Sequence, residues 1–111
     1  MTPTIACSLN ALDTIQRARQ LECRRVIRAA TGETRELSDG YALQLGPDPE
    51  VFLKAAEWIT LERRCCPFLN FKLELKNDGD AWLWLTGPEG SKAFLDDAMR
   101  SGRQDSPSAA D

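Results

Sequence analysis

The chain has 111 residues, of which 42% are hydrophobic and 28% are charged, and its formal net charge is −3. These values are typical of one globular domain, and the negative balance gives no reason to expect nucleic acid as a partner. No apolar run approaches the roughly 20 residues of a membrane span. The first residues lack the basic and apolar regions of a secretory signal, so we expect a cytoplasmic protein with reduced cysteines.

The sequence contains no histidine. Histidine is the commonest general base near neutral pH and the commonest nitrogen ligand of metals, so its absence excludes Ser-His-Asp and Cys-His catalysis within one chain. An enzyme would need Glu62 or an arginine-stabilised thiolate as its base, and this argues against catalysis. Metal binding would depend on sulfur, with carboxylate or water completing the shell.

The first part of the chain predicts a short extended segment over residues 3–8 and then a helix. Asn10 is a favourable N-cap, and Asp13 follows three residues later, so the helix should run from about Ala11 to Ala30. Its apolar side would carry Leu12, Ile15, Ala18, Glu22 or Cys23, Val26 and Ala30. The five arginines of this segment predict a solvated face rather than an anion site.

Two hairpins and two further helices follow. Asp39-Gly40 predicts a turn between strands over residues 35–37 and 41–45, and Asn77-Asp78-Gly79 predicts another between strands over residues 68–75 and 81–86. Asp48 should cap a helix that begins at Pro49 and ends near Cys65, because Pro67 forces the preceding residue out of the helical region. A short last helix would carry Phe94, Leu95, Ala98 and Met99.

This order predicts an α+β fold, in which two β-hairpins form an antiparallel sheet with helices packed on one face. The arrangement is ββαββα-like after an N-terminal strand and helix. Residues 1–100 would form a single domain, and residues 101–111 are polar and should form a disordered tail.

The candidate functional residues gather where the helix that begins at Pro49 ends. Glu62 precedes Cys65 and Cys66 by about one helical turn, so all three side chains can face one small region. Free cysteine commonly packs as a small hydrophobe, and a carboxylate at a helix end commonly pairs with arginine, so a purely structural interpretation stays open. A disulfide between these adjacent cysteines would require strained geometry.

Several motifs resemble a family of small, uncharacterised bacterial proteins. They are Ile5-Ala6-Cys7-Ser8-Leu9, Asp39-Gly40-Tyr41-Ala42, Glu62-Arg63-Arg64-Cys65-Cys66-Pro67-Phe68-Leu69 with Phe71, and Trp84-Leu85-Thr86-Gly87 with Gly90. The most specific part is Glu-x-x-Cys-Cys-Pro-Phe. The resemblance implies that Cys7, Cys65 and Cys66 form one group and that Cys23 is incidental, but it implies no activity.

Three thiolates, with Glu62 or water as a fourth ligand, would suit a soft ion such as zinc, copper(I), mercury(II) or arsenite. The metal-binding hypothesis therefore uses Cys65, Cys66, Cys7 and Glu62. It predicts a sensor, buffer or carrier rather than a catalyst. Adjacent cysteines are not the Cys-x-x-Cys spacing of a zinc knuckle, so the motif does not identify the ion.

Trp82 and Trp84 alternate with leucines along the last predicted strand, so both should lie on the sheet face opposite Leu83 and Leu85. An aromatic patch of this kind commonly contacts another surface. The alternative hypothesis is therefore a non-catalytic homodimeric interaction module that uses the tryptophan face and has structural cysteines. The two hypotheses differ in one respect, because metal binding requires the Cys65 and Cys66 sulfurs to converge at an accessible site.

Overall fold

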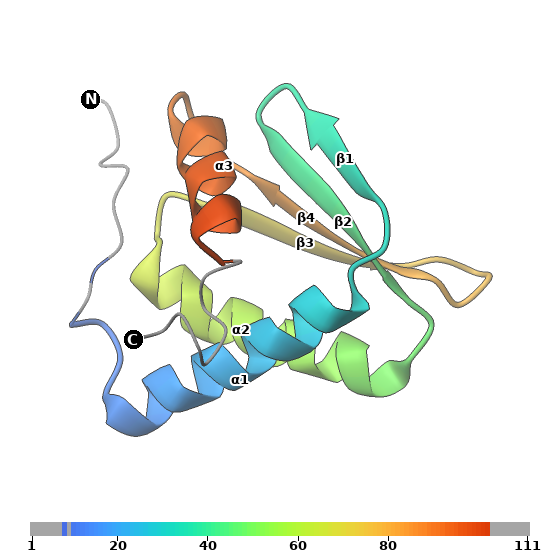
Figure 1. Ribbon diagram of the computed structural model, residues 1–111, viewed down its shortest axis with the longest axis horizontal. Coiled ribbons are helices and arrows are strands. Elements are labelled where there is room, and N and C mark those ends of the chain that lie inside the picture. Colours follow the sequence, from blue (N-terminus) through green and yellow to red (C-terminus); the bar gives the residue numbers. More distant parts are fainter. Residues whose placement is uncertain (1–7, 9, 103–111) are drawn as a thin grey trace.

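A computed structural model describes Ser8 and residues 10–102, and side chains up to residue 99. The elements are α1 (Thr14–Ala30), β1 (Thr34–Leu37), β2 (Gly40–Gly46), α2 (Pro49–Cys65), β3 (Asn70–Leu75), β4 (Ala81–Thr86) and α3 (Ser91–Gly102). The strands form an antiparallel sheet in the order β1-β2-β4-β3, and α1 and α2 lie side by side beneath it (Figure 1). The predicted α+β fold is confirmed. The N-terminal strand predicted over residues 3–8 lies outside the described residues, apart from Ser8, which is in no strand.

The sheet joins two hairpins through their second strands. β2 and β4 lie at the centre with Leu43 paired to Leu83, and a register shift between Gln44 and Gly46 precedes the last pair, Gly46 with Ala81. The strands approach so closely at Gly40 that an added Cβ would lie 1.9 Å from the carbonyl oxygen of Leu85. Glycine at this position therefore allows the central pair of strands to form.

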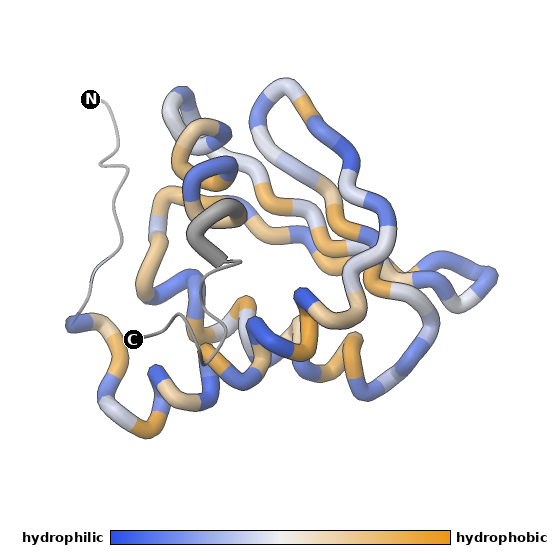
Figure 2. The backbone as a smooth tube through the Cα atoms, viewed as in Figure 1, coloured by the Kyte–Doolittle hydropathy of each residue, from blue (hydrophilic) through white to orange (hydrophobic). Residues whose placement is uncertain are grey.

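The core fills the space between one face of the sheet and the helices. Leu83 is fully buried at the centre of this cluster, and Leu95 brings α3 onto the same side of the sheet as α1 and α2. Phe94 packs edge-to-face on Phe68, with the ring centroids 5.0 Å apart. The β3–β4 turn, at the right of Figure 2, is hydrophilic. The core contacts place the helices over one face of the sheet (Figure 1).

The first helix differs from its prediction at both its start and its buried face. Asp13, rather than Asn10, is the N-cap, because Asp13 and Gln16 exchange side-chain-to-backbone hydrogen bonds in a capping box. Ile15 is 73% exposed, whereas Gln20, Cys23 and Ile27 are the buried residues of the helix. The predicted stripe is therefore wrong at Ile15 and Ala18, whereas its Cys23 is buried and its Val26 and Ala30 pack against the core.

α2 begins and ends as predicted, whereas α3 extends beyond its predicted end. The Asp48 carboxylate accepts a hydrogen bond from the backbone N–H of Glu50, and α2 ends at Cys65, two residues before Pro67, as predicted. α3 extends to Gly102, so residues 101 and 102, which the sequence assigns to a disordered tail, are helical. The rest of the predicted tail lies outside the described residues.

Candidate thiol site

The site is built on the last turn of α2. The backbone N–H of Cys66 donates to the carbonyl oxygen of Glu62 at 2.7 Å, and Pro67 then turns the chain away from the helix. This geometry directs Glu62 and Cys66 to the same side, so that Cys66 Sγ lies 3.3 Å from Glu62 Oε2. Cys66 is fully buried and Glu62 is 8% exposed. The predicted proximity of Glu62 and Cys66 is therefore observed.

The Glu62 carboxyl group has a second partner on α1. Gln20 Nε2 donates to Glu62 Oε1 at 2.6 Å in the interior of the protein. Burial raises the pKa of Glu62 above its ordinary value, while the positive charge of Arg24 and the hydrogen bond from Gln20 act in the opposite direction. Glu62 therefore has a larger protonated fraction than an exposed glutamate at the same pH.

Cys66 is disulfide-bonded, whereas Cys23 and Cys65 are free. The expectation that the cysteines are thiols is therefore wrong for Cys66 in this structure, and Cys65 is not its partner. A disulfide sulfur has no proton to donate. The contact with Glu62 Oε2 is consequently a hydrogen bond only when the carboxyl group is protonated, and burial favours that protonated form.

Cys65 has different surroundings from Cys66. Its sulfur lies 3.4 Å from the carbonyl oxygen of Ser8, and its own carbonyl oxygen accepts a 2.7 Å hydrogen bond from the Ser8 backbone N–H. Arg64 Nη2 donates to the carbonyl oxygen of Ala11 at 3.0 Å. These bonds attach Ser8 and Ala11 to the end of α2.

Both cysteine side chains at this corner are buried, which the metal-binding hypothesis did not predict. Within the part of the chain that the structure describes, no three or more histidine, cysteine, aspartate or glutamate side chains form a group that could hold a metal ion. Cys7, the predicted third sulfur ligand, lies outside the described residues. The described residues thus place Glu62 beside Cys66 without completing a coordination shell.

Cys23 is almost fully buried in the core, and burial is the main reason that its pKa is raised. A buried thiol of this kind packs as a small apolar group. Its position on the buried side of α1 is compatible with the incidental role that the sequence indicates for it.

The tryptophans lie on the sheet face opposite the helices, but other side chains cover them. Trp82 is only 2% exposed, and the Arg35 guanidinium and the Lys76 amine lie 4.4 Å and 5.2 Å from the centroid of its ring. Lys72 lies 4.3 Å from the ring centroid of Trp84, which is partly buried. The strands' own long cationic side chains therefore occupy much of the predicted aromatic patch.

Sequence reasoning did not identify Gln20, Trp58 or Arg24 as neighbours of Glu62. Trp58 lies one turn before Glu62 and is buried on the same helix, which the 3.6-residue period could have indicated. Gln20 could have been found as the polar residue in the series Gln20, Cys23 and Ile27. Its pairing with a glutamate distant in sequence leaves no local pattern.

Comparisons with protein-family models, with curated proteins and with solved structures find no match to this chain. The resemblance to small bacterial proteins with the Glu-x-x-Cys-Cys-Pro-Phe motif therefore stays a prediction. Within residues 10–102, none of the helices combines the length and the apolar composition needed to cross a membrane.

Proposed function

We propose that this protein binds a soft metal or metalloid ion in its reduced form, through the sulfurs of Cys65 and Cys66 with Cys7 and Glu62 completing the site. The observation that carries the proposal is the buried contact between Cys66 Sγ and the Glu62 carboxyl group at 3.3 Å. Soft thiolates select ions such as zinc, copper(I) and arsenite, and a carboxylate is a common additional ligand of zinc.

Glu62 has the properties that a proton acceptor for Cys66 requires. A thiol must lose its proton before its sulfur binds an ion. In the reduced protein, the Cys66 proton passes to the Glu62 carboxylate and from there to water, so that the Cys66 thiolate binds the ion through a sulfur lone pair and the Glu62 carboxylate is again available as a ligand. The pKa of Glu62 is raised by burial, so its carboxylate accepts a proton more readily than that of an exposed glutamate.

The sequence indicates Cys7 as the third sulfur ligand. Cys7 directly precedes Ser8, whose backbone is hydrogen-bonded to Cys65.

Ion binding also requires reduction at Cys66. A dithiol reductant would supply two electrons and two protons, leaving two thiols on the protein and a disulfide in the reductant. The proposal therefore predicts that only the reduced protein binds the ion.

The alternative function, a non-catalytic homodimer joined through Trp82 and Trp84, has less support. A homodimer interface needs an accessible apolar surface. Arg35 and Lys76 lie over Trp82, which is only 2% exposed, so the chain itself shields this tryptophan. The same mass spectra that test ion binding would show whether a dimer forms.

Native mass spectrometry tests the proposal. Anaerobically reduced protein would be titrated with zinc, copper(I) and arsenite in the presence of glutathione. Glutathione competes for these ions, so only a site that binds an ion more tightly than free thiols do will retain it. We expect one ion to be retained at one per chain by the reduced protein and to be absent from the oxidised protein.

Single variants assign the ligands. Cys66→Ser, Cys65→Ser and Cys7→Ser should each reduce retention, while Cys23→Ala should not, because Cys23 is a free, buried cysteine on α1, a different element. Circular dichroism would confirm that each variant is folded. If the folded Cys66→Ser variant retains the ion as the unchanged chain does, or if no ion survives competition, the proposal is refuted.

A further inference from the structure

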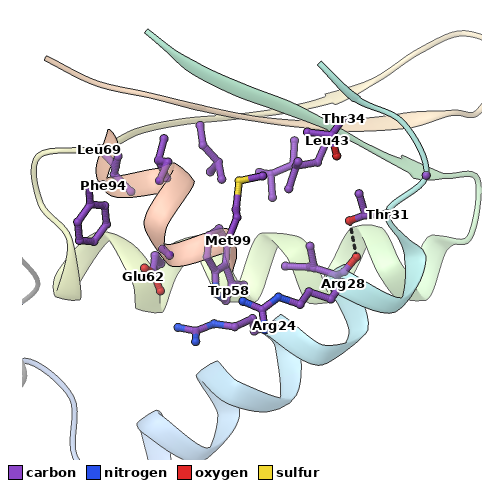
Figure 3. Close-up of a pocket in the computed structure, with 16 residues that line it drawn as sticks. Arg24, Arg28, Thr31, Thr34, Leu43, Trp58, Glu62, Leu69, Phe94 and Met99 are labelled. Atoms are coloured by element: carbon purple, nitrogen blue, oxygen red, sulfur yellow. Dashed lines mark hydrogen bonds between the residues drawn. The ribbon is translucent and has the colours of Figure 1, made fainter. Parts of the chain in front are cut away.

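A cavity lies on the helix-covered side of the sheet, between the sheet and all three helices. Its volume is about 470 Å³, which falls within the usual range for small-molecule sites. Leu83 and Leu85 line it from β4, and Phe94 and Met99 line it from α3 (Figure 3). A cavity with this lining favours the apolar part of a ligand.

The α1 side of the cavity is positively charged. Arg24 and Arg28 both line it, and Figure 3 shows them reaching from α1 toward the space beneath α3. Each guanidinium has several N–H donors, so it can contact an anion while keeping contacts within the protein. Glu62 is the only acidic side chain among the described residues that line the cavity. Among the described lining residues, the two guanidinium charges therefore outnumber the one carboxylate.

Trp58 gives an independent indication of a polar ligand. It lines the same cavity, and its buried Nε1 has no hydrogen-bond partner among the described residues. Buried indole N–H groups normally have an acceptor. The wall thus combines an orphaned donor, two cationic side chains and a large apolar surface.

We propose that this cavity binds a small amphipathic carboxylate, with its apolar chain against Leu83, Leu85 and Phe94 and its carboxylate at Arg24 and Arg28. The chain's own residues 103–111 are a poor candidate, because the sequence Arg-Gln-Asp-Ser-Pro-Ser-Ala-Ala-Asp has no large apolar side chain to fill the cavity. The proposal does not require ion binding, since it uses none of the cysteines, although Glu62 lines the cavity and also belongs to the proposed ion site.

Titration calorimetry with three probes that carry an unbranched chain of about ten carbon atoms tests both parts of the proposal on the unchanged protein. Decanoate, decanol and decyltrimethylammonium share an apolar chain and differ in the charge of their head groups. We expect decanoate to bind at least about tenfold more tightly than the other two, because a hydrogen bond to a charged group commonly contributes such a factor. Tryptophan fluorescence should change with decanoate, and the change should disappear in Trp58→Phe.

Variants identify the head-group site. The pair Arg24→Gln/Arg28→Gln should lose about tenfold or more in decanoate affinity. Arg25→Gln is the matched control, because Arg25 is exposed on the same helix and does not line the cavity. Equal affinity for the three probes would overturn the proposal, and so would a folded double variant that binds decanoate as the unchanged chain does. If decanoate binds only to a variant truncated after Gly102, then residues 103–111 are the occupant of the cavity in the full chain, and the proposal fails.

Discussion

Replacement of Glu62 by glutamine tests the environment assigned to the centre of the thiol site. Glutamine has nearly the same shape and keeps a carbonyl oxygen that can accept the hydrogen bond from Gln20 Nε2. It cannot ionise, so it imitates the protonated carboxyl group at every pH. The comparison therefore isolates the cost of burying the Glu62 charge.

The direction of the pH effect follows from the raised pKa of Glu62. Between the ordinary value of 4.5 and the raised value in the folded protein, the folded state holds more of this proton than the unfolded state. Stability of the unchanged protein should therefore fall as the pH rises through that window and then become constant with respect to Glu62. Each pKa unit of the upward shift corresponds to about 1.4 kcal/mol.

Urea unfolding over a pH series that starts below 4.5 and extends to neutral pH measures this difference. The oxidised protein should be used throughout, so that the state of Cys66 does not change. We expect the stability of Glu62→Gln, relative to the unchanged chain, to increase as the pH rises. Glu89→Gln, at an exposed loop position, provides the baseline. Parallel pH profiles for Glu62→Gln and the unchanged chain would refute the assigned environment.

Three further predictions concern stability and can be checked by urea unfolding. Leu83→Ala should cost about 2–5 kcal/mol because it opens a cavity at a fully buried position, whereas Leu53→Ala at an exposed position should change stability by less than about 0.5 kcal/mol; equal effects would contradict the assigned core. Gly40→Ala should cost about 1–3 kcal/mol or more, because its Cβ would meet the carbonyl oxygen of Leu85, and a neutral result would contradict the close approach of β2 and β4. Asp13→Ala should cost about 0.5–2 kcal/mol through loss of the helix cap, and an unchanged midpoint would argue against the capping box.

Local chemistry explains why most of the elements could be predicted from the sequence. Asp39 lies in the connection between β1 and β2, Gly40 begins β2, and Pro67 follows the end of α2 closely. Each of these signals acts within a few residues of the chain. The sequence could therefore predict where strands and helices begin and end, with errors of a few residues where two caps compete, as at Asn10 and Asp13.

The parts that were not predicted depend on contacts between distant segments. The pairing of β2 with β4 joins the two hairpins, and no turn signal specifies it. Gln20 and Glu62 are 42 residues apart, so the hydrogen bond that explains a polar residue on the buried side of α1 is visible only in the folded chain. In the same way, Arg35 covers Trp82 from another strand, which the alternation of residues along β4 could not show.

X-ray absorption spectroscopy of the ion-loaded protein tests the central proposal most directly, because it counts the sulfur ligands. The sample would be reduced protein that carries the ion retained in the mass spectra, compared with Cys66→Ser prepared in the same way. For zinc, we expect three sulfurs at about 2.3 Å and one oxygen ligand in the unchanged chain, with one sulfur fewer in the variant. A shell without sulfur, or the same number of sulfurs in both proteins, would contradict the proposal that Cys66 binds the ion.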